Sequence, residues 1–128
     1  MYYSTEGKKR IAALFNAFHD YIANHWAIDV MYSPRLGFIY IAGIDERDAC
    51  IIETAKGLFE LLADDIMMDV AFAKENELLT EDALSQEERE EIRRRVGGIL
   101  ATMREGREEY MNLLEDMMGQ FNRNALDD

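Results

Sequence analysis

Two stretches decide the fold: residues 52–70, IETAKGLFELLADDIMMDV, and residues 92–121, IRRRVGGILATMREGREEYMNLLEDMMGQF. In both, apolar side chains recur mostly every three or four residues, which is the spacing of one face of an α-helix. The first stripe is Ile52, Ala55, Phe59, Leu62, Ile66 and Val70, and the second is Ile92, Val96, Ile99, Met103, Tyr110, Leu113, Met117 and Phe121. The other faces are densely acidic. The pattern predicts an antiparallel helix pair with its carboxylates turned outward.

Local signals set the ends of these two helices. Asp45 is suited to cap a helix, so the first member of the pair is predicted over residues 46–74. Ser85 and Glu88 have the spacing of a capping box, in which each side chain satisfies a backbone donor of the other residue. The second member is therefore predicted over residues 86–122.

The N-terminal third adds a helix and a hairpin. Helical spacing predicts a first helix over residues 6–27, with Ser4 or Thr5 as its cap. In residues 28–43, β-branched and aromatic residues flank a turn that contains Pro34, which predicts a β-hairpin. The predicted fold is mainly α, of α+β class: three helices with a β-hairpin between the first and second, and a long antiparallel helical pair at the C-terminal side.

The last predicted helix is too long for a compact molecule of this size. Residues 86–122 would form a helix of ~55 Å, against a globule of about 36 Å across. Either the molecule is elongated, or the helix bends near Gly97 and Gly98, or a second chain covers the overhang. Gly106 lies in the apolar stripe and would let another helix approach closely. These features predict a homodimer.

Composition sets broad limits. A chain of 128 residues with 48% hydrophobic residues fits one globular domain, residues 1–128. The single cysteine, Cys50, has no intramolecular partner, which favours a reducing compartment and predicts a buried thiol. No apolar run approaches the ~20 residues that cross a bilayer, and the N-terminus lacks the design of a signal peptide. A cytoplasmic location is expected.

The net charge of −12 is unevenly placed. Residues 1–44 hold four basic and three acidic side chains, a net charge of +1, so the rest of the chain carries −13. Direct binding to nucleic acid requires clustered Lys and Arg, and an acidic membrane surface would repel this chain. The charge therefore disfavours both, and it leaves basic partners, metal cations or simple solubility as explanations.

The densest acidic segment is residues 75–91, with eight acidic side chains, one arginine and a net charge of −7. One interpretation is a solvated helix end that keeps the protein soluble. The other is a surface that presents carboxylates to a basic groove, imitating a nucleic-acid backbone. The candidate partner-binding residues are Glu81, Asp82, Glu87, Glu88, Glu90, Glu91, Glu105, Glu108 and Glu109.

Asp65 and Asp69 lie four residues apart and share one side of a helix that is otherwise apolar. Buried carboxylates need partners, and in an antiparallel pair Asp69 should come level with Arg89 and Arg93. Structural Asp–Arg pairing is the favoured interpretation. The alternative is a metal or general-base site joined by His25 and Asp29, although the Glu-x-x-His unit of di-iron bundles is missing.

No motif identifies an enzyme, so neither catalytic residues nor a cofactor is predicted. The first hypothesis is a non-enzymatic interaction protein: a small acidic inhibitor or adaptor that occupies a basic surface, such as that of a nucleic-acid-binding enzyme. The second is a metal-dependent hydrolase of a phosphorylated small molecule, using Asp65 and Asp69. The third is a homodimeric structural subunit joined through hairpin strands or helix ends.

Overall fold

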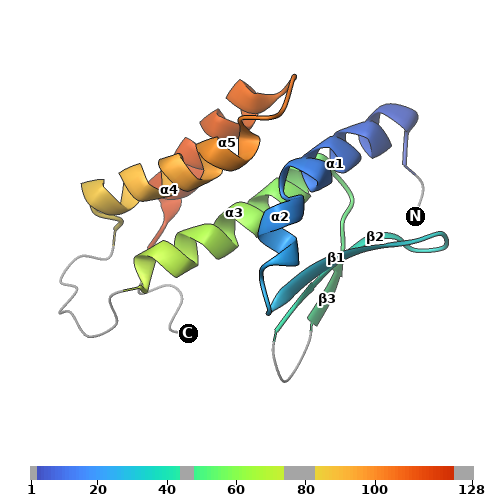
Figure 1. The fold of residues 1–128 in the computed structure, drawn as a ribbon, viewed down its shortest axis with the longest axis horizontal. Coiled ribbons are helices and arrows are strands. Elements are labelled where there is room, and N and C mark those ends of the chain that lie inside the picture. Colours follow the sequence, from blue (N-terminus) through green and yellow to red (C-terminus); the bar gives the residue numbers. More distant parts are fainter. Residues whose placement is uncertain (1–2, 44–47, 74–82, 123–128) are drawn as a thin grey trace. The chain divides into compact units, whose positions relative to one another are not determined.

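The computed structural model describes residues 3–43, 48–73 and 83–122 (Figure 1). The elements are α1 (Thr5–Ala17), α2 (His19–Ala23), β1 (Ile28–Ser33), β2 (Gly37–Ala42), β3 (Asp48–Ile51), α3 (Ala55–Ala71), α4 (Gln86–Leu100) and α5 (Arg107–Gln120). Helices and an antiparallel sheet together confirm the α+β class. The chain divides into an N-terminal unit, residues 1–59, and a C-terminal unit, residues 60–128, and α3 begins in the first and continues into the second. A single domain stays a prediction.

The first helix begins as predicted and ends earlier. The Ser4 hydroxyl accepts a hydrogen bond from the Gly7 N–H at 2.9 Å, which confirms the serine cap. The prediction of one helix over residues 6–27 is wrong, because the chain leaves helical geometry at Phe18 and again after Ala23. Phe18 is fully buried, with its ring 6.3 Å from that of Phe59, so the bend directs a large side chain into the core.

The predicted hairpin is present as β1 and β2, whose last pair in register is Ser33 with Gly37. The Ser33 hydroxyl accepts hydrogen bonds from the N–H groups of Arg35 and Leu36 at 3.3 and 3.1 Å and so closes the turn. Gly37 has φ of +87°, and a Cβ there would lie 2.4 Å from the Tyr3 hydroxyl. Glycine is required at this position for both reasons.

A third strand replaces the expected start of the second helix. Residues 48–51 form β3, which pairs antiparallel with β2, for example Ile51 with Ile39. The prediction of a helix from residue 46 is therefore wrong, and α3 begins at Ala55 with the Thr54 hydroxyl accepting the Gly57 N–H at 3.0 Å. Long-range pairing to an apolar strand has overridden a plausible local cap.

Cys50 lies in β3 and is exposed, so the prediction of a buried thiol is wrong. All four residues of β3 are exposed because the strand is at the end of the sheet order β1-β2-β3. The residue after β3, Ile52, is 2% exposed.

The Tyr3 hydroxyl ties the start of the chain to the sheet. It accepts a hydrogen bond from the Phe38 N–H at 3.1 Å and donates one to the Ile52 carbonyl oxygen. The Ile52 N–H in turn donates to the Phe38 carbonyl at 2.9 Å. The phenol thus bridges the Phe38 N–H and the Ile52 carbonyl, in place of the second direct hydrogen bond of this pair, and extends the β2–β3 ladder by one pair.

The first apolar stripe is confirmed, since all six of its residues are buried. Burial on α3 is wider than one stripe, and the further buried residues are Leu58, Ala63, Met67 and Ala71. Met67, which the helical projection assigns to the polar face, is only 2% exposed.

The prediction of one helix over residues 86–122 is wrong. α4 ends at Leu100, and α5 begins at Arg107 after Gly106, whose φ of +82° lies in the left-handed region that glycine favours. Gly97 and Gly98, proposed as a bend, lie inside α4. The helices fold into a hairpin and lie side by side, so the overhang that argued for a second chain does not exist. A homodimer stays a prediction.

Candidate interaction surface

The predicted acidic residues are divided between two helices. Glu87, Glu88, Glu90 and Glu91 lie in the first two turns of α4, and Glu105, Glu108 and Glu109 lie just before and in the first turn of α5. Glu81 and Asp82 fall outside the described residues. Seven of the nine candidates can therefore be placed, and their contacts differ widely.

Glu88 has a local structural role. Its N–H donates to the Ser85 hydroxyl at 3.1 Å, and its side chain accepts the Ser85 N–H at 2.8 Å. This reciprocal pair is the predicted capping box, which is confirmed. A carboxylate held in this way against the start of its own helix is not free to contact a partner.

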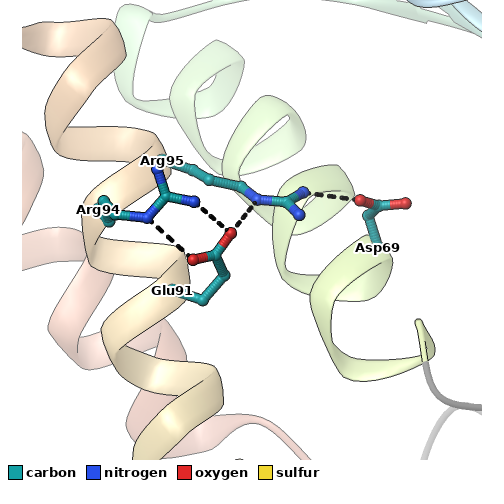
Figure 2. A network of polar contacts seen from close by, with 4 residues as sticks. All are labelled: Asp69, Glu91, Arg94 and Arg95. Carbon is teal, nitrogen blue, oxygen red and sulfur yellow. Dashed lines mark hydrogen bonds and ion pairs between the residues drawn. The ribbon is translucent and has the colours of Figure 1, made fainter.

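Glu91 is the centre of a network between α4 and α3 (Figure 2). Arg94 donates two hydrogen bonds to its carboxylate at 2.9 and 2.6 Å, and Arg95 donates one at 2.9 Å. These bonds, and the positive charges behind them, lower the pKa of Glu91 to about 2. Arg95 continues to Asp69 on α3 at 2.7 Å. Glu91 therefore belongs to an internal charge network.

Asp69 pairs with an arginine, as the favoured interpretation expected, but with a different one. The register predicted from the sequence placed Asp69 level with Arg89 and Arg93, whereas its partner in the structure is Arg95. The pair is partly exposed, with 68% of the Asp69 side chain accessible, so the attraction is screened by solvent. Its main effect is to fix which side of α4 faces α3.

Arg93 joins α4 to α5. It donates two parallel hydrogen bonds to the Glu115 carboxylate at 2.8 and 2.7 Å, a bidentate geometry that is stronger than a single contact. The bonds raise the pKa of Arg93 and lower that of Glu115. The contact sets the antiparallel register of the hairpin.

The arginines of α4 balance its acids. The helix holds four glutamates and four arginines, so its net charge is zero. What remains are two separate groups of exposed carboxylates: the α4 patch, Glu87 and Glu90, and the α5 patch, Glu105, Glu108 and Glu109. Glu90 also accepts a hydrogen bond from Gln86 at 3.3 Å. Among the described residues, none of the α5 patch carboxylates forms an ion pair.

The two patches lie at opposite ends of the hairpin. α4 has 15 residues and is therefore about 22 Å long at 1.5 Å per residue. Because α5 returns antiparallel, the start of α5 is next to the end of α4. The continuous acidic face expected from the sequence is thus interrupted by the arginines of α4.

The residues of the alternative metal site have other contacts. The His25 Nδ1 accepts the Ala27 N–H at 3.0 Å in the N-terminal unit, and Asp69 is held by Arg95 in the C-terminal unit. Within residues 3–43, 48–73 and 83–122, no group of three or more His, Cys, Asp or Glu side chains could hold a metal ion. Burial and the neighbouring Asp65 charge raise the pKa of Asp64.

Sequence reasoning missed two features of the surface. Arg94 and Arg95 follow Glu91 by three and four residues, a spacing that could have indicated the network. It also missed the exposed apolar side chains of the N-terminal unit. The large exposed ones in the described chain are Trp26 at 73%, Met31 at 50%, Tyr32 at 49%, and Leu36 and Ile51 at 43%.

Comparisons with known proteins give no relative. No protein-family model, no curated protein and no solved structure matches the chain. In the described part of the chain, none of the helices combines the length and the apolar character needed to span a membrane.

Proposed function

We propose that this chain is a non-enzymatic interaction protein: an acidic inhibitor or adaptor that occupies a basic surface of a partner protein. A nucleic-acid-binding enzyme is the partner class that best fits such a surface, because its groove carries clustered Lys and Arg. The C-terminal unit would make the contact. It holds eight basic and nineteen acidic side chains, a net charge of −11.

The α5 patch is the observation that carries the proposal. Glu105, Glu108 and Glu109 are exposed, and no described cation pairs with them. Glu108 and Glu109 gain some stabilisation from the positive end of the α5 dipole, but their carboxylates remain open to solvent. A partner's Lys or Arg could reach them without breaking a contact within the chain.

The separation of the patches supports a contact at two points. A nucleic-acid duplex carries about one charge per 1.7 Å of axis, whereas the hairpin has the arginine–carboxylate pairs of Arg93, Arg94 and Arg95 between its acidic ends. A basic groove would therefore meet the α4 and α5 patches as two anchors about 15–20 Å apart along the hairpin. We expect the α5 patch to contribute more, because its three carboxylates form no hydrogen bond or ion pair in the described chain, whereas Glu90 of the α4 patch accepts a hydrogen bond from Gln86.

Capture from the native lysate tests the proposal. The full chain is immobilised, and bound proteins are compared at about 0.1 M and about 1 M salt, between which the screening length falls from about 10 Å to about 3 Å. A charge-held partner should be retained at low salt and lost at high salt. Binding that is unchanged at high salt would contradict the proposal.

A matched pair of variants locates the contact. Glu108→Gln with Glu109→Gln removes two charges from the α5 patch, and Glu53→Gln with Glu60→Gln removes two exposed carboxylates elsewhere. The first variant should lose the partner and the second should keep it, although both change the net charge equally. Equal losses would show that only the overall charge matters, and the α5 patch would be abandoned as the contact.

A further inference from the structure

β3 is an edge strand with an open side. It follows β2 in the order β1-β2-β3 and, in the described residues, has a strand on one side only. All four of its residues are exposed, Ile51 at 43%. An edge of this kind presents unpaired N–H and C=O groups to any further strand.

The register shows which residues face that open side. The Ile52 N–H bonds to the Phe38 carbonyl, so Phe38 and Ile52 form a hydrogen-bonded pair. Pairs alternate along an antiparallel ladder. Cys50 therefore directs its backbone groups toward β2, and those of Ala49 and Ile51 point outward.

The other side of the sheet gives the same alternation. The Gly43 N–H bonds to the Ala27 carbonyl, so Ile41 is in a hydrogen-bonded pair with Asp29 and directs its backbone groups toward β1. Its neighbour Tyr40 must then direct its groups toward β3, where it pairs with Cys50. Two separate hydrogen bonds thus assign the same outward residues to β3.

The opposite edge is closed by its own side chain. By the same alternation the Val30 N–H points away from β2, and the Asp29 carboxylate accepts it at 2.8 Å. A charged side chain that covers an edge donor is a common way to prevent strand addition. On β3, the one side-chain contact that an outward carbonyl makes within the described residues is weak: the Cys50 thiol donates to the Ile51 carbonyl oxygen at 3.7 Å.

We propose that β3 pairs antiparallel with β3 of a second copy of this chain, about a two-fold axis at Cys50. A two-fold axis centred between two residues would place each outward-facing residue opposite an inward-facing one, so no backbone hydrogen bonds would form between the strands. Among the remaining registers, only the one centred on Cys50 pairs both outward residues of the strand. In that register Ala49 of each copy is opposite Ile51 of the other copy. The strand is self-complementary in this register.

Charge makes the N-terminal unit, rather than the C-terminal unit, the better place for a second copy. The N-terminal unit holds six basic and seven acidic side chains, a net charge of −1, against −11 for the C-terminal unit. Repulsion between two copies is therefore weaker at the N-terminal unit than at the C-terminal unit, even though the segment that holds β3, residues 45–53, carries four acidic side chains and one arginine. A four-residue edge buries far less than the roughly 1,200–2,000 Å² of a stable interface, so the dimer should be weak and concentration-dependent.

The register can be tested through Cys50 itself. In the proposed dimer Cys50 is opposite its own copy in a non-hydrogen-bonded pair, with Cα atoms about 4.5 Å apart, inside the range of a disulfide. Diamide is added to the full chain: two thiols form one S–S bond, and their two electrons and two protons reduce diamide to its hydrazine. The covalent dimer is followed on non-reducing gels.

Two single-cysteine controls move the thiol by one residue. They are Cys50→Ala with Ala49→Cys, and Cys50→Ala with Ile51→Cys, all at exposed positions. Cross-linking at Cys50 should be about tenfold or more faster than at either control, because only that position brings two sulfurs within bonding range. Equal rates at the three positions, a faster control, or no cross-link at Cys50 would each overturn the proposal.

A backbone variant separates pairing from chance collision. Ala49→Pro removes an outward N–H, which edge strands tolerate, and leaves Cys50 in place. It should keep the circular dichroism spectrum and slow the Cys50 cross-link to the rate of the controls. A folded Ala49→Pro variant that still cross-links at the original rate would show that strand pairing is not involved.

Discussion

The two units differ in what they leave at the surface. The N-terminal unit is nearly neutral and carries the large apolar side chains that are exposed in the described chain, together with an open strand edge. The C-terminal unit carries a net charge of −11, and its helices are joined by arginine–carboxylate contacts. One surface is suited to backbone pairing, which salt affects little, and the other to charge pairing, which salt weakens.

Core truncations should have the largest effects and show whether the units unfold together. Phe18→Ala should cost about 3–5 kcal/mol and Leu114→Ala about 2–5 kcal/mol, because both side chains are fully buried. Urea unfolding, followed by circular dichroism, measures both. Two transitions, each lowered by one variant, would establish independent units, whereas a single shared transition would show that they unfold cooperatively. A loss below about 1 kcal/mol for Phe18→Ala would contradict its burial.

Glycine substitutions should separate a required glycine from a dispensable one. Gly37→Ala places a side chain at φ +87°, which costs about 1–2 kcal/mol, and also displaces the Tyr3 hydroxyl. Gly98→Ala is the control: a Cβ there meets nothing within 4 Å, so alanine should stabilise α4 by about 0.5–1 kcal/mol. Thermal melts of both variants test this. We expect Gly37→Ala to lower the melting temperature and Gly98→Ala to raise it. Equal decreases for the two variants would contradict the conclusion that only Gly37 is required.

The two serine caps allow a comparison of equal chemistry in each unit. Ser85→Ala and Ser4→Ala each remove a hydroxyl that accepts a backbone N–H and should cost about 1 kcal/mol. Ser85→Ala keeps the backbone N–H that the Glu88 side chain accepts, so half of the capping box remains and its loss should be no larger than that of Ser4→Ala. Chemical denaturation gives both values. A clearly larger loss for Ser85→Ala would show that the Glu88 side chain does not hold the Ser85 N–H once the hydroxyl is gone.

The smallest effect should be a change in acid sensitivity. The pKa of Glu91 is lowered to about 2 from an ordinary value of 4.5, so its pairing stabilises the folded chain fully above about pH 4.5. That contribution falls as the pH drops from there toward 2, because the unfolded chain takes up the proton first. Glu91→Gln should make the free energy of unfolding less dependent on pH between about 2 and 4.5. Urea denaturation at several pH values measures this.

A neighbouring carboxylate is the control for that change. Glu87→Gln alters the same helix turn, but Glu87 has no ion pair among the described residues. It should leave the pH dependence as in the unchanged chain. If both variants weaken the pH dependence of the free energy of unfolding equally, the network around Glu91 is not the cause of that dependence.

Sequence patterns identified the elements that local signals control. The capping box at Ser85, the Ser4 cap, the hairpin turn and the stripe on α3 are all set by residues a few positions apart. Their spacing is directly visible in the chain. These predictions are confirmed for that reason.

The wrong predictions are at places where contacts with residues outside the local segment determine the secondary structure. β3 pairs with a strand some ten residues away, and no local signal in residues 48–51 outweighs the helix cap that Asp45 suggested. The break before α5 depends on the left-handed Gly106, which a helical projection treats as a gap in the stripe. After that break the buried residues of α5 are Tyr110, Leu114 and Met118, one position away from the predicted Leu113 and Met117.

The same distinction applies to the candidate surface. Counting charges located the acidic residues, and their exposure in α4 and α5 agrees with the outward face expected. Which carboxylates remain open depends on side-chain partners: Glu88 bonds to its own cap, Glu91 to two arginines and Glu115 to Arg93. The sequence contains those arginines, but only the register of the hairpin determines which carboxylate each arginine pairs with.

The Tyr3 phenol has a consequence for the order of folding during synthesis. It leaves the ribosome well before one of its two partners, Ile52, which is 49 positions later. The β1–β2 hairpin can form from nearby residues as soon as it emerges, whereas the end of the β2–β3 ladder must wait for the far partner. We expect the N-terminal segment to dock last, after the strands that it fastens have been made.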